Sequence, residues 1–465
     1  MDQYLFDIAI VGGGFSGTLV ATHLLSKSPR PLRIVLLETL PERLGRGVAY
    51  STVDRCHLLN VPAGNMSAYP DRPAHFLEWA QRQADLIDPP WVTSVDGKAY
   101  LPRRAYGAYL RSLLDDAEPA AGPGIELERR LDEVTAIAQR QGEVVLQTAA
   151  GGFVTARRVV LALGNFRPRD PAIDTPEFYR DPRYQGCPWD PQALAAVAKT
   201  NACLLIGAGL TMADWALALS RTGYHGTIHV LSRRGLWPAP HRPYQPVAFD
   251  PRLRDEPRSV RWLLRLVRSR IESEGADWRA VIDSLRPHSQ ELWCDLSVAE
   301  QRRFLRHLRH YWDLHRHRVA PLVDEALDGL LRSGRLLRHV GWLQACTESA
   351  DGITVTYRPR GRSVAETIQV DAVVNCSGSE SDYRKLDSPL VRSLLGQGLA
   401  RPDPLHLGLD VAANGALVGT DGIPSQQLFT LGPPKKGMLW ETTAVPELRG
   451  QAAELAEVLL LSGAA

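Results

Sequence analysis

The chain has 465 residues with a formal net charge of +2, of which 44% are hydrophobic and 23% charged. This is the composition of an ordinary globular protein with room for two or three domains, and it indicates no acidic partner such as nucleic acid. The six cysteines include no C-x-x-C pair, so neither a disulfide framework nor a metal site is expected. No run approaches the roughly 18 apolar residues of a membrane helix. No signal peptide precedes the first strand, so we expect a soluble, cytoplasmic protein.

The first predicted element is a buried strand at 8–11 that runs directly into a glycine-rich turn and a helix. The turn has the pattern G-x-G-x-x-G. In this setting the first glycine makes a tight turn, the second lets the backbone approach a pyrophosphate, and the third lets helix and strand pack closely. The anion lies at the helix N-terminus. The pattern predicts an adenine-dinucleotide site formed by Gly12, Gly14, Ser16 and Gly17.

The next predicted strand, 33–37, ends in Glu38. This acid lies roughly 20 residues beyond the glycines, where a carboxylate accepts the ribose hydroxyls of an adenine nucleotide. The following loop carries Arg46, which either neutralises a cofactor phosphate or is an ordinary solvated arginine.

An apolar segment at 57–68 contains two asparagines, a proline and a glycine, which indicates buried backbone without regular structure. Such a segment either lines a ligand or satisfies its own polar groups. We expect Asn60, Val61 and Met66 to contact the cofactor. Asn60 and Asn65 are the catalytic candidates, which would hold the nicotinamide or the reacting oxygen.

The strand predicted at 158–165 ends in small residues, and Gly164 is expected where the chain passes a bound dinucleotide. A second strand, glycine turn and helix follow at 202–214, and Gly207, Gly209 and Thr211 are the expected contacts. The next strand, 227–231, is followed by Arg233 and Arg234 instead of an acid. A cation there accommodates the 2′-phosphate of NADP, so we assign FAD to the first site and NADPH to the second. The alternative is that both arginines are surface charges.

Residues 251–341 are predicted to be helical and are rich in arginine and tryptophan. Interspersed acids argue against a nucleic-acid surface. His307 and His310 share a helix face, but the flanking arginines would repel a metal ion. We therefore expect this segment to form a substrate cavity or lid.

A strand ending in small residues at 370–379 is predicted to return the chain to the first domain, with Gly378 near the cofactor. At the end of the chain, Gly432 begins a glycine–proline loop, and Thr442 and Thr443 are candidate caps of the last helix. The N-terminus of that helix would face the flavin ring. The predicted fold is α/β with two Rossmann-like domains and a helical insertion. Its segments are FAD-binding (1–175 and 371–465), NAD(P)H-binding (195–250 and 342–370) and the insertion (251–341).

Four blocks, at 45–51, 59–66, 207–214 and 432–443, resemble those of two-dinucleotide-binding-domain flavoproteins. The resemblance is closest to bacterial FAD/NAD(P)-binding proteins of the YdhS type, which are similar to flavin-dependent N-monooxygenases. The Baeyer–Villiger fingerprint is not intact, because the stretch from Phe178 to Asp190 lacks its glycine and histidine.

The resemblance implies an FAD-dependent, NADPH-consuming monooxygenase. Such an enzyme uses O2 to oxygenate a nucleophilic nitrogen or sulfur of a small molecule through a C4a-(hydro)peroxyflavin. Two alternatives stay open: an NAD(P)H oxidase or reductase of a quinone or other acceptor, and a flavin-binding sensor without turnover. A disulfide reductase is disfavoured because no active cysteine pair is present. No oligomeric state is predicted.

Overall fold

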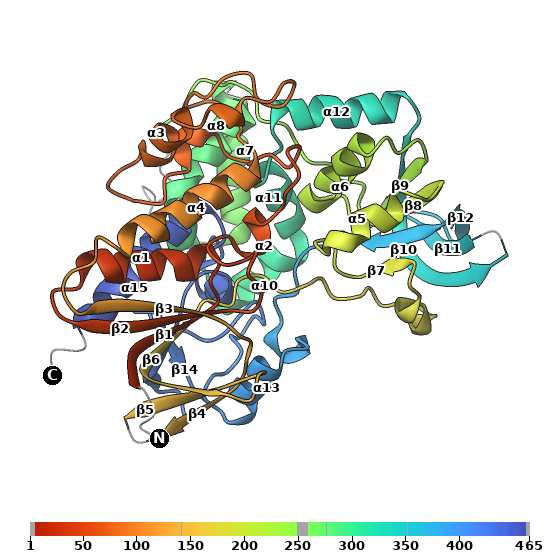
Figure 1. The fold of residues 1–465 in the computed structure, drawn as a ribbon. Coiled ribbons are helices and arrows are strands. Elements are labelled where there is room, and N and C mark those ends of the chain that lie inside the picture. The colour runs from red at the N-terminus through yellow and green to blue at the C-terminus, as the bar shows by residue number, and fades with distance from the viewer. Residues whose placement is uncertain (1–4, 141, 249–258, 276, 351, 462–465) are drawn as a thin grey trace.

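The computed structural model describes residues 5–140, 142–248, 259–275, 277–350 and 352–461. Two separate β-sheets organise these residues, and each sheet is covered by helices (Figure 1). The α/β architecture with two Rossmann-like units and a helical insertion, as predicted, is confirmed.

The first sheet has eight strands. Its main path runs β14-β15-β6-β1-β2-β3, and β5 joins β6 at one side and carries β4. β1 pairs in parallel with β2 and with β6, so the glycine turn after β1 opens at the carboxyl edge of the sheet. Helices α1, α4 and α15 cover one face, and α13 packs against β4 on the other. The elements of this domain are β1 (Leu5–Val11), α1 (Phe15–Lys27), β2 (Leu32–Glu38), α2 (Gly47–Tyr50), η1 (Ala63–Asn65), α3 (His75–Gln81), η2 (Ala84–Leu86), α4 (Arg103–Ala117), β3 (Ile125–Leu131), β4 (Val134–Arg140), β5 (Glu143–Thr148), β6 (Phe153–Leu161), α13 (Pro389–Gly396), β14 (Ala416–Val418), β15 (Pro424–Thr430), η6 (Pro433–Lys435), α14 (Lys436–Leu439) and α15 (Val445–Leu461).

The second sheet has seven strands in the order β12-β11-β10-β9-β8-β13-β7. β8 lies between β9 and β13, and all three are parallel, which repeats the arrangement of β1 between β2 and β6. The elements are η3 (Pro176–Arg180), β7 (Tyr184–Gln185), α5 (Pro191–Val197), β8 (Ala202–Ile206), α6 (Leu210–Arg221), β9 (Thr227–Ser232), α12 (Pro321–Arg332), β10 (Leu336–Ser349), β11 (Gly352–Pro359), β12 (Glu366–Val370) and β13 (Ala372–Asn375). The short turn η5 (Tyr383–Lys385), which follows β13, packs in the core of the first domain.

The helical insertion lies between the two sheet domains (Figure 1). Its helices are α7 (Val260–Glu274), α8 (Trp278–Leu285), η4 (Arg286–His288), α9 (Ser289–Asp295), α10 (Val298–His307) and α11 (Arg309–Arg316). The two histidines predicted to share one helix face, His307 and His310, lie on two successive helices, because α10 ends at His307 and α11 begins at Arg309. Residues 251–258 of the predicted insertion lie outside the described residues.

Two predicted boundaries are wrong. The strand expected to return the chain to the first domain, β13, pairs in parallel with β7 and β8 and belongs to the second sheet. The chain returns only after it, so Gly378 follows a strand of the second domain. The insertion also ends earlier than residue 341, because α12 packs on α6 and β10 already pairs with β9 from Leu336.

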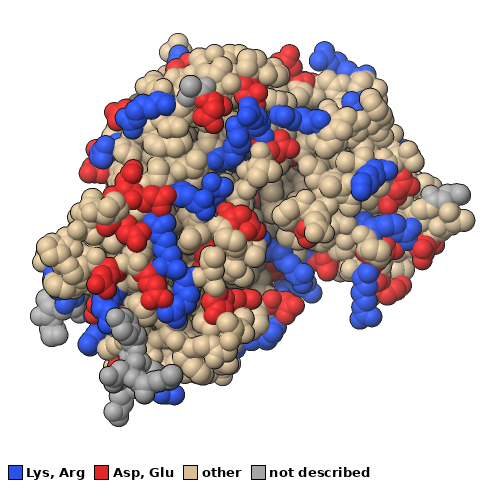
Figure 2. All heavy atoms as spheres, in the orientation of Figure 1, with Lys and Arg blue, Asp and Glu red and all other residues tan. Residues whose placement is uncertain are grey.

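Charges of both signs are interspersed over the face in Figure 2, without a large area of one sign. Among the described helices, none combines the length and the apolar character that crossing a membrane would require.

Candidate functional site

The first glycine turn leaves no space for a side chain at its two ends. Gly12 has a φ of 105°, and a Cβ there would lie 2.3 Å from the carbonyl oxygen of Ala162, just beyond β6. A Cβ on Gly17 would lie 1.9 Å from the Gly12 carbonyl oxygen. The Gly12 N–H donates to Leu37 O (2.9 Å), which fixes the turn to the end of β2. The backbone N–H groups at the start of α1 are therefore held at the edge of the sheet, where an anion binds.

Two of the predicted polar residues lie beside this turn. Glu38 is 9% exposed, and its carboxylate accepts from the N–H of Gly13 (2.9 Å) and of Thr39 (2.8 Å). Arg46 lies next to Gly47, whose Cα is 3.2 Å from where a Gly14 Cβ would be. The buried Nε of Arg46 has no hydrogen-bond partner among the described residues. A buried donor needs an acceptor, so the turn and Arg46 together fit the phosphates of a dinucleotide.

The carboxy-terminal loop meets the same turn. Gly432 packs against Ser16, whose Oγ is 3.3 Å from where a Gly432 Cβ would lie. Thr442 is fully buried, and its hydroxyl donates to Gly432 O (2.9 Å), whereas Thr443 is exposed. The prediction that Thr442 caps the last helix is wrong, because its hydroxyl oxygen accepts from the side-chain Nε2 of Gln451 (2.9 Å), where a cap would accept from a backbone N–H of the first turn of α15.

The second glycine turn repeats the construction of the first. Gly207 has a φ of 104°, its N–H donates to Leu231 O (2.8 Å), and a Cβ there would lie 2.6 Å from Cys376 O, just after β13. β13 is thus the counterpart of β6, but in the second domain. Gly378 lies two residues beyond this contact, and Gly164 lies two beyond Ala162 in the first domain. A Cβ on Gly164, Gly209 or Gly378 would meet nothing within 4 Å. Thr211 lies in the first turn of α6.

Three exposed arginines carry positive charge near the end of β9: two follow β9 itself, and the third follows β11. Arg233, Arg234 and Arg360 are exposed, and none of them forms an ion pair with a described acid. Burial and then the charges of Arg234, Arg360 and Arg233 lower the pKa of His310, so α11 of the insertion approaches this group. Uncompensated positive charge beside a dinucleotide turn suits an additional phosphate.

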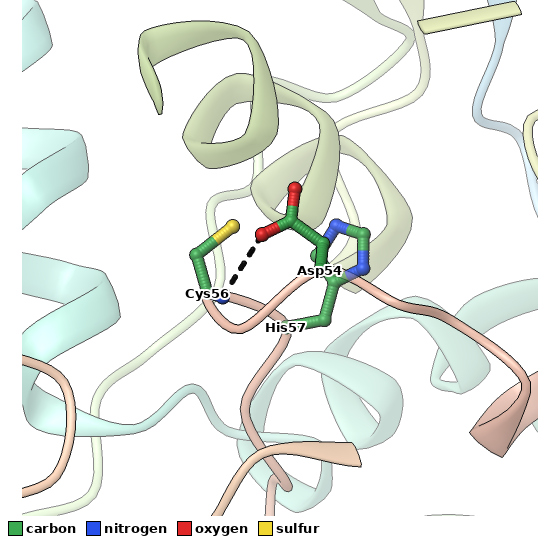
Figure 3. A group of neighbouring side chains, drawn as sticks. All are labelled: Asp54, Cys56 and His57. Carbon is green, nitrogen blue, oxygen red and sulfur yellow. Dashed lines mark hydrogen bonds between the residues drawn. The ribbon is translucent and has the colours of Figure 1, made fainter. Parts of the chain in front are cut away.

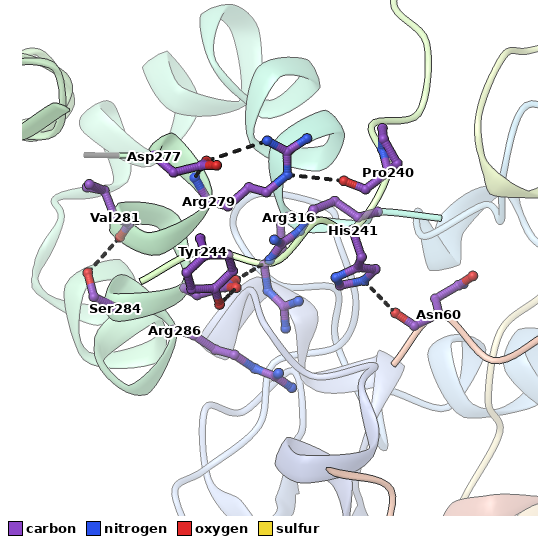
Figure 4. A network of polar contacts seen from close by, with 12 residues as sticks. Asn60, Pro240, His241, Tyr244, Asp277, Arg279, Val281, Ser284, Arg286 and Arg316 are labelled. Atoms are coloured by element: carbon purple, nitrogen blue, oxygen red, sulfur yellow. Dashed lines mark hydrogen bonds and ion pairs between the residues drawn. The ribbon is translucent and has the colours of Figure 1, made fainter. Parts of the chain in front are cut away.

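The residues of the irregular segment 57–68 lie in different surroundings. Asn60 is half-buried, and its carbonyl oxygen accepts from Nε2 of His241, 2.9 Å away (Figure 4). Val61 packs against the first core, and Met66, 3% exposed, lies within it. Asn65 is exposed in the turn η1. The Met66 side chain is therefore a core residue, while Asn60 faces the junction of the domains.

The junction makes stability depend on pH. Burial, with Arg318 nearby, lowers the pKa of His241 to about 4 from its ordinary value of 6.5. Below pH 6.5 the unfolded chain therefore binds a proton that the folded chain excludes, and this contribution to stability is lost as the pH falls from 6.5 to about 4. We expect the Tm to fall over this range. In His241→Gln the fall should be smaller but not absent, because burial lowers the pKa of His229 and His317 to about 4 as well. Calorimetry of both proteins at three pH values between 4 and 6.5 checks this prediction. An equal fall of the Tm with pH in wild type and in His241→Gln would contradict it.

The insertion helices and the carboxy-terminal loop line an apolar cavity of about 530 Å³. Four tryptophans from three of its helices and the carboxy-terminal loop line it: Trp278, Trp293, Trp312 and Trp440. The Trp293 indole N–H donates to Gly437 O (2.9 Å), and the Trp293 ring stacks on Trp440 (5.1 Å between centroids). The insertion is thereby fixed to the loop that meets the first glycine turn. This contact agrees with the predicted role as a cavity or lid, which stays a prediction.

Two groupings were missed from sequence. Asp54, Cys56 and His57 place potential metal-ligand atoms within 4.8 Å of one another (Figure 3). Burial and the Asp54 carboxylate raise the pKa of the Cys56 thiol, and Arg221 Nε lies 3.8 Å from Asp54 Oδ1, so the surroundings disfavour a cation. The second grouping is the buried ion pair between Arg103 of α4 and Asp214 of α6, which joins the two domains. The D-x-C-H spacing at 54–57 could have predicted the first grouping from sequence. The ion pair has no local signal, because its two residues are far apart in the sequence.

Comparison with known proteins finds one family model that matches part of the chain. Residues 9–166 match the model of a family described as FAD-NAD(P)-binding. No curated protein matches the chain.

Solved structures match over the whole chain. Ornithine hydroxylase from Pseudomonas aeruginosa is 18% identical with a TM-score of 0.66, and the alignment covers 99% of this chain and 100% of that one. An ornithine N-hydroxylase from Kutzneria sp. 744, solved with reduced FAD, NADP+ and L-ornithine, is 16% identical with a TM-score of 0.62, covering 98% and 99%. Bacillithiol disulfide reductase from Staphylococcus aureus is 12% identical with a TM-score of 0.56, covering 98% of each chain. These likenesses confirm the fold of two dinucleotide-binding domains.

Proposed function

We propose that the protein is an FAD-dependent, NADPH-consuming monooxygenase that oxygenates a nucleophilic nitrogen or sulfur of a small molecule. The observation that carries this is the pair of matching glycine turns, one beside an acid and the other beside uncompensated arginines. N-hydroxylases among the similar structures support the choice of nitrogen. The sequence has no C-x-x-C pair, which argues against disulfide reductase chemistry, and the six free cysteines support a cytoplasmic location.

In this proposal FAD would be held by the turn Gly12–Gly17, Glu38 and Arg46, and NADPH by the turn at Gly207 with Arg233 and Arg234. FAD supplies hydride acceptance and oxygen activation when bound. The chain's own residues orient the two nucleotides, and Asn60 offers an amide at the junction between them. Exclusion of water from that junction would favour oxygen transfer over loss as hydrogen peroxide.

The test uses purified holoprotein with bound FAD. NADPH is added without oxygen, and bleaching of the flavin is followed; air and a panel of primary amines and thiols are then supplied. The proposal expects bleaching by NADPH, and at least one substrate that yields an N- or S-oxygenated product in near-stoichiometric ratio to NADPH consumed. Hydrogen peroxide alone with every compound would identify an oxidase. A yellow protein that neither NADPH nor NADH bleaches would identify a binding or sensor protein.

Replacing both Arg233 and Arg234 with glutamine should select against NADPH. Charge-assisted hydrogen bonds to a 2′-phosphate contribute about 1.5–3 kcal/mol, so the Kd for NADPH should rise on the order of 10- to 100-fold. The Kd for NADH, which lacks this phosphate, should change less than about twofold. Stopped-flow flavin reduction at varied nucleotide concentration measures both, with Arg261→Gln, an exposed arginine of α7, as the control. Equal weakening for both nucleotides would rule out 2′-phosphate recognition.

A further inference from the structure

Two buried arginines at the inner end of the insertion have donors without hydrogen-bond partners. The Arg318 side chain is 2% exposed and donates through Nη2 to Asp283, but its Nε and Nη1 have no hydrogen-bond partner among the described residues. The Arg316 side chain is 7% exposed. Its Nε is 3.7 Å from Glu441 Oε2 and its Nη2 is 3.8 Å from Glu447 Oε1. These distances exceed hydrogen-bond length, so both nitrogens stay unsatisfied.

The surrounding charges do not remove the need for an acceptor. Arg286 lies beside the same acids, with Nε 3.3 Å from Glu447 Oε1, and its Nη2 is also buried without a partner. Arg279 pairs with Asp277, whose side chain is 34% exposed, and donates to Pro240 O (3.1 Å). The four guanidinium groups thus face, besides Asp277, the carboxylates of Asp283, Glu441 and Glu447, whose side chains are 26%, 5% and 13% exposed. Buried donors left unpaired cost free energy, and a guanidinium fork matches the oxygens of a carboxylate or phosphate.

The cluster lies where the three parts of the molecule meet (Figure 4). Val319, one residue after Arg318, exchanges backbone hydrogen bonds with the second-domain segment: its N–H donates to Ala239 O, and its carbonyl accepts from His241 N–H (3.0 Å each). His241 in turn donates to Asn60 O in the first domain. Glu447 opens α15 of that domain. A ligand group on these arginines would therefore lie beside Asn60, the residue expected near the nicotinamide.

We infer that Arg316 and Arg318 form a binding site for an oxyanion, a carboxylate or phosphate group, at the junction of the insertion and the two nucleotide domains. The inference rests on the proposed function for the role of the site, because the oxyanion belongs either to the substrate or to a phosphate of NADPH. Whether the oxyanion belongs to the substrate or to NADPH, the guanidinium groups of Arg316 and Arg318 set the distance of the bound molecule from Asn60.

The experiment separates anion binding from turnover. Holoprotein is titrated with inorganic phosphate, succinate and benzoate at constant ionic strength, and the Tm is followed. Wild type should show a saturable rise with at least one anion. Arg316→Gln should bind that anion on the order of tenfold more weakly, whereas Arg306→Gln, an exposed arginine of α10, should match wild type. No saturable rise in wild type, or equal binding by Arg316→Gln, would overturn the inference and leave water as the acceptor.

The Kd for NADPH, measured by flavin reduction, distinguishes the two sources of the oxyanion. An unchanged Kd for NADPH in Arg316→Gln assigns the site to the substrate, and a Kd raised about tenfold assigns it to an NADPH phosphate. If Arg316→Gln does not fold, crystals of wild type soaked in selenate give the answer, since anomalous density should lie within hydrogen-bond distance of Arg316 and Arg318. Density only elsewhere would overturn the site. Failure of NADPH to bleach the flavin would refute the proposed function without touching the anion titration.

Discussion

Gly12→Ala should purify without FAD. The added Cβ would lie 2.3 Å from Ala162 O in a backbone with a φ of 105°, so either the turn or the end of β6 must move. Left-handed backbone alone costs a non-glycine residue about 1–3 kcal/mol, and the steric overlap adds to it. Displacing the N–H groups that would hold the pyrophosphate should weaken FAD binding on the order of a hundredfold, about 2.7 kcal/mol.

Flavin absorbance of the purified variant, followed by titration with FAD, measures this effect. Gly450→Ala is the matched control: it lies inside α15, and its Cβ would meet nothing within 4 Å. That substitution should keep full flavin and raise stability by up to about 1 kcal/mol, because alanine favours helix. Wild-type flavin content in Gly12→Ala would refute the assignment of the first turn to FAD.

The contrast between these two glycines explains which features are predictable from sequence. A glycine turn is a local signal, since strand, turn and helix follow one another directly, and the structure shows both turns in the predicted form. Glu38 also lies beside the first turn, as its offset from the glycines predicts. Domain membership is not local: β13, like β6, is followed by a segment with small residues, and only pairing with β8 shows that it belongs to the second sheet.

The same limit applies to side chains whose partners are distant in sequence. Thr442 has the residue type of a cap, but its hydroxyl oxygen accepts from the side chain of Gln451, and its proton is donated to Gly432 O. The break at Leu308, between α10 and α11, falls inside a continuous amphipathic pattern, which carries no stop signal. Arg316 and Arg318 look like ordinary basic residues of a helical segment, and only folding buries them. The contact between the two domains at α4 and α6 belongs to this group too.

Arg103→Met should destabilise the protein by about 3–5 kcal/mol, which is the range for removing one partner of a buried ion pair. Arg103 opens α4 of the first domain, and its Nη1 lies 2.8 Å from Asp214 Oδ2 on α6 of the second; the side chains are 11% and 8% exposed. Arg103 Nε also donates to Leu58 O (3.1 Å), so the arginine ties the segment before Asn60 to both domains. Its loss leaves Asp214 charged and unpaired among apolar neighbours. Urea unfolding followed by flavin and tryptophan fluorescence gives the change.

The double variant Arg103→Met/Asp214→Leu distinguishes a lost pair from lost packing. Removing both charges eliminates the unpaired carboxylate, so most of the stability should return. Lys27→Met is the control, because its pair with Glu457 is exposed (42% and 59%) and should contribute less than about 1 kcal/mol. The ion pair also fixes the distance between the two glycine turns, so the restored double variant should still reduce its flavin more slowly with NADPH than wild type. If Arg103→Met unfolds at the wild-type urea concentration, the domains are held together by their apolar contacts, and Asp214 reaches water in the folded protein.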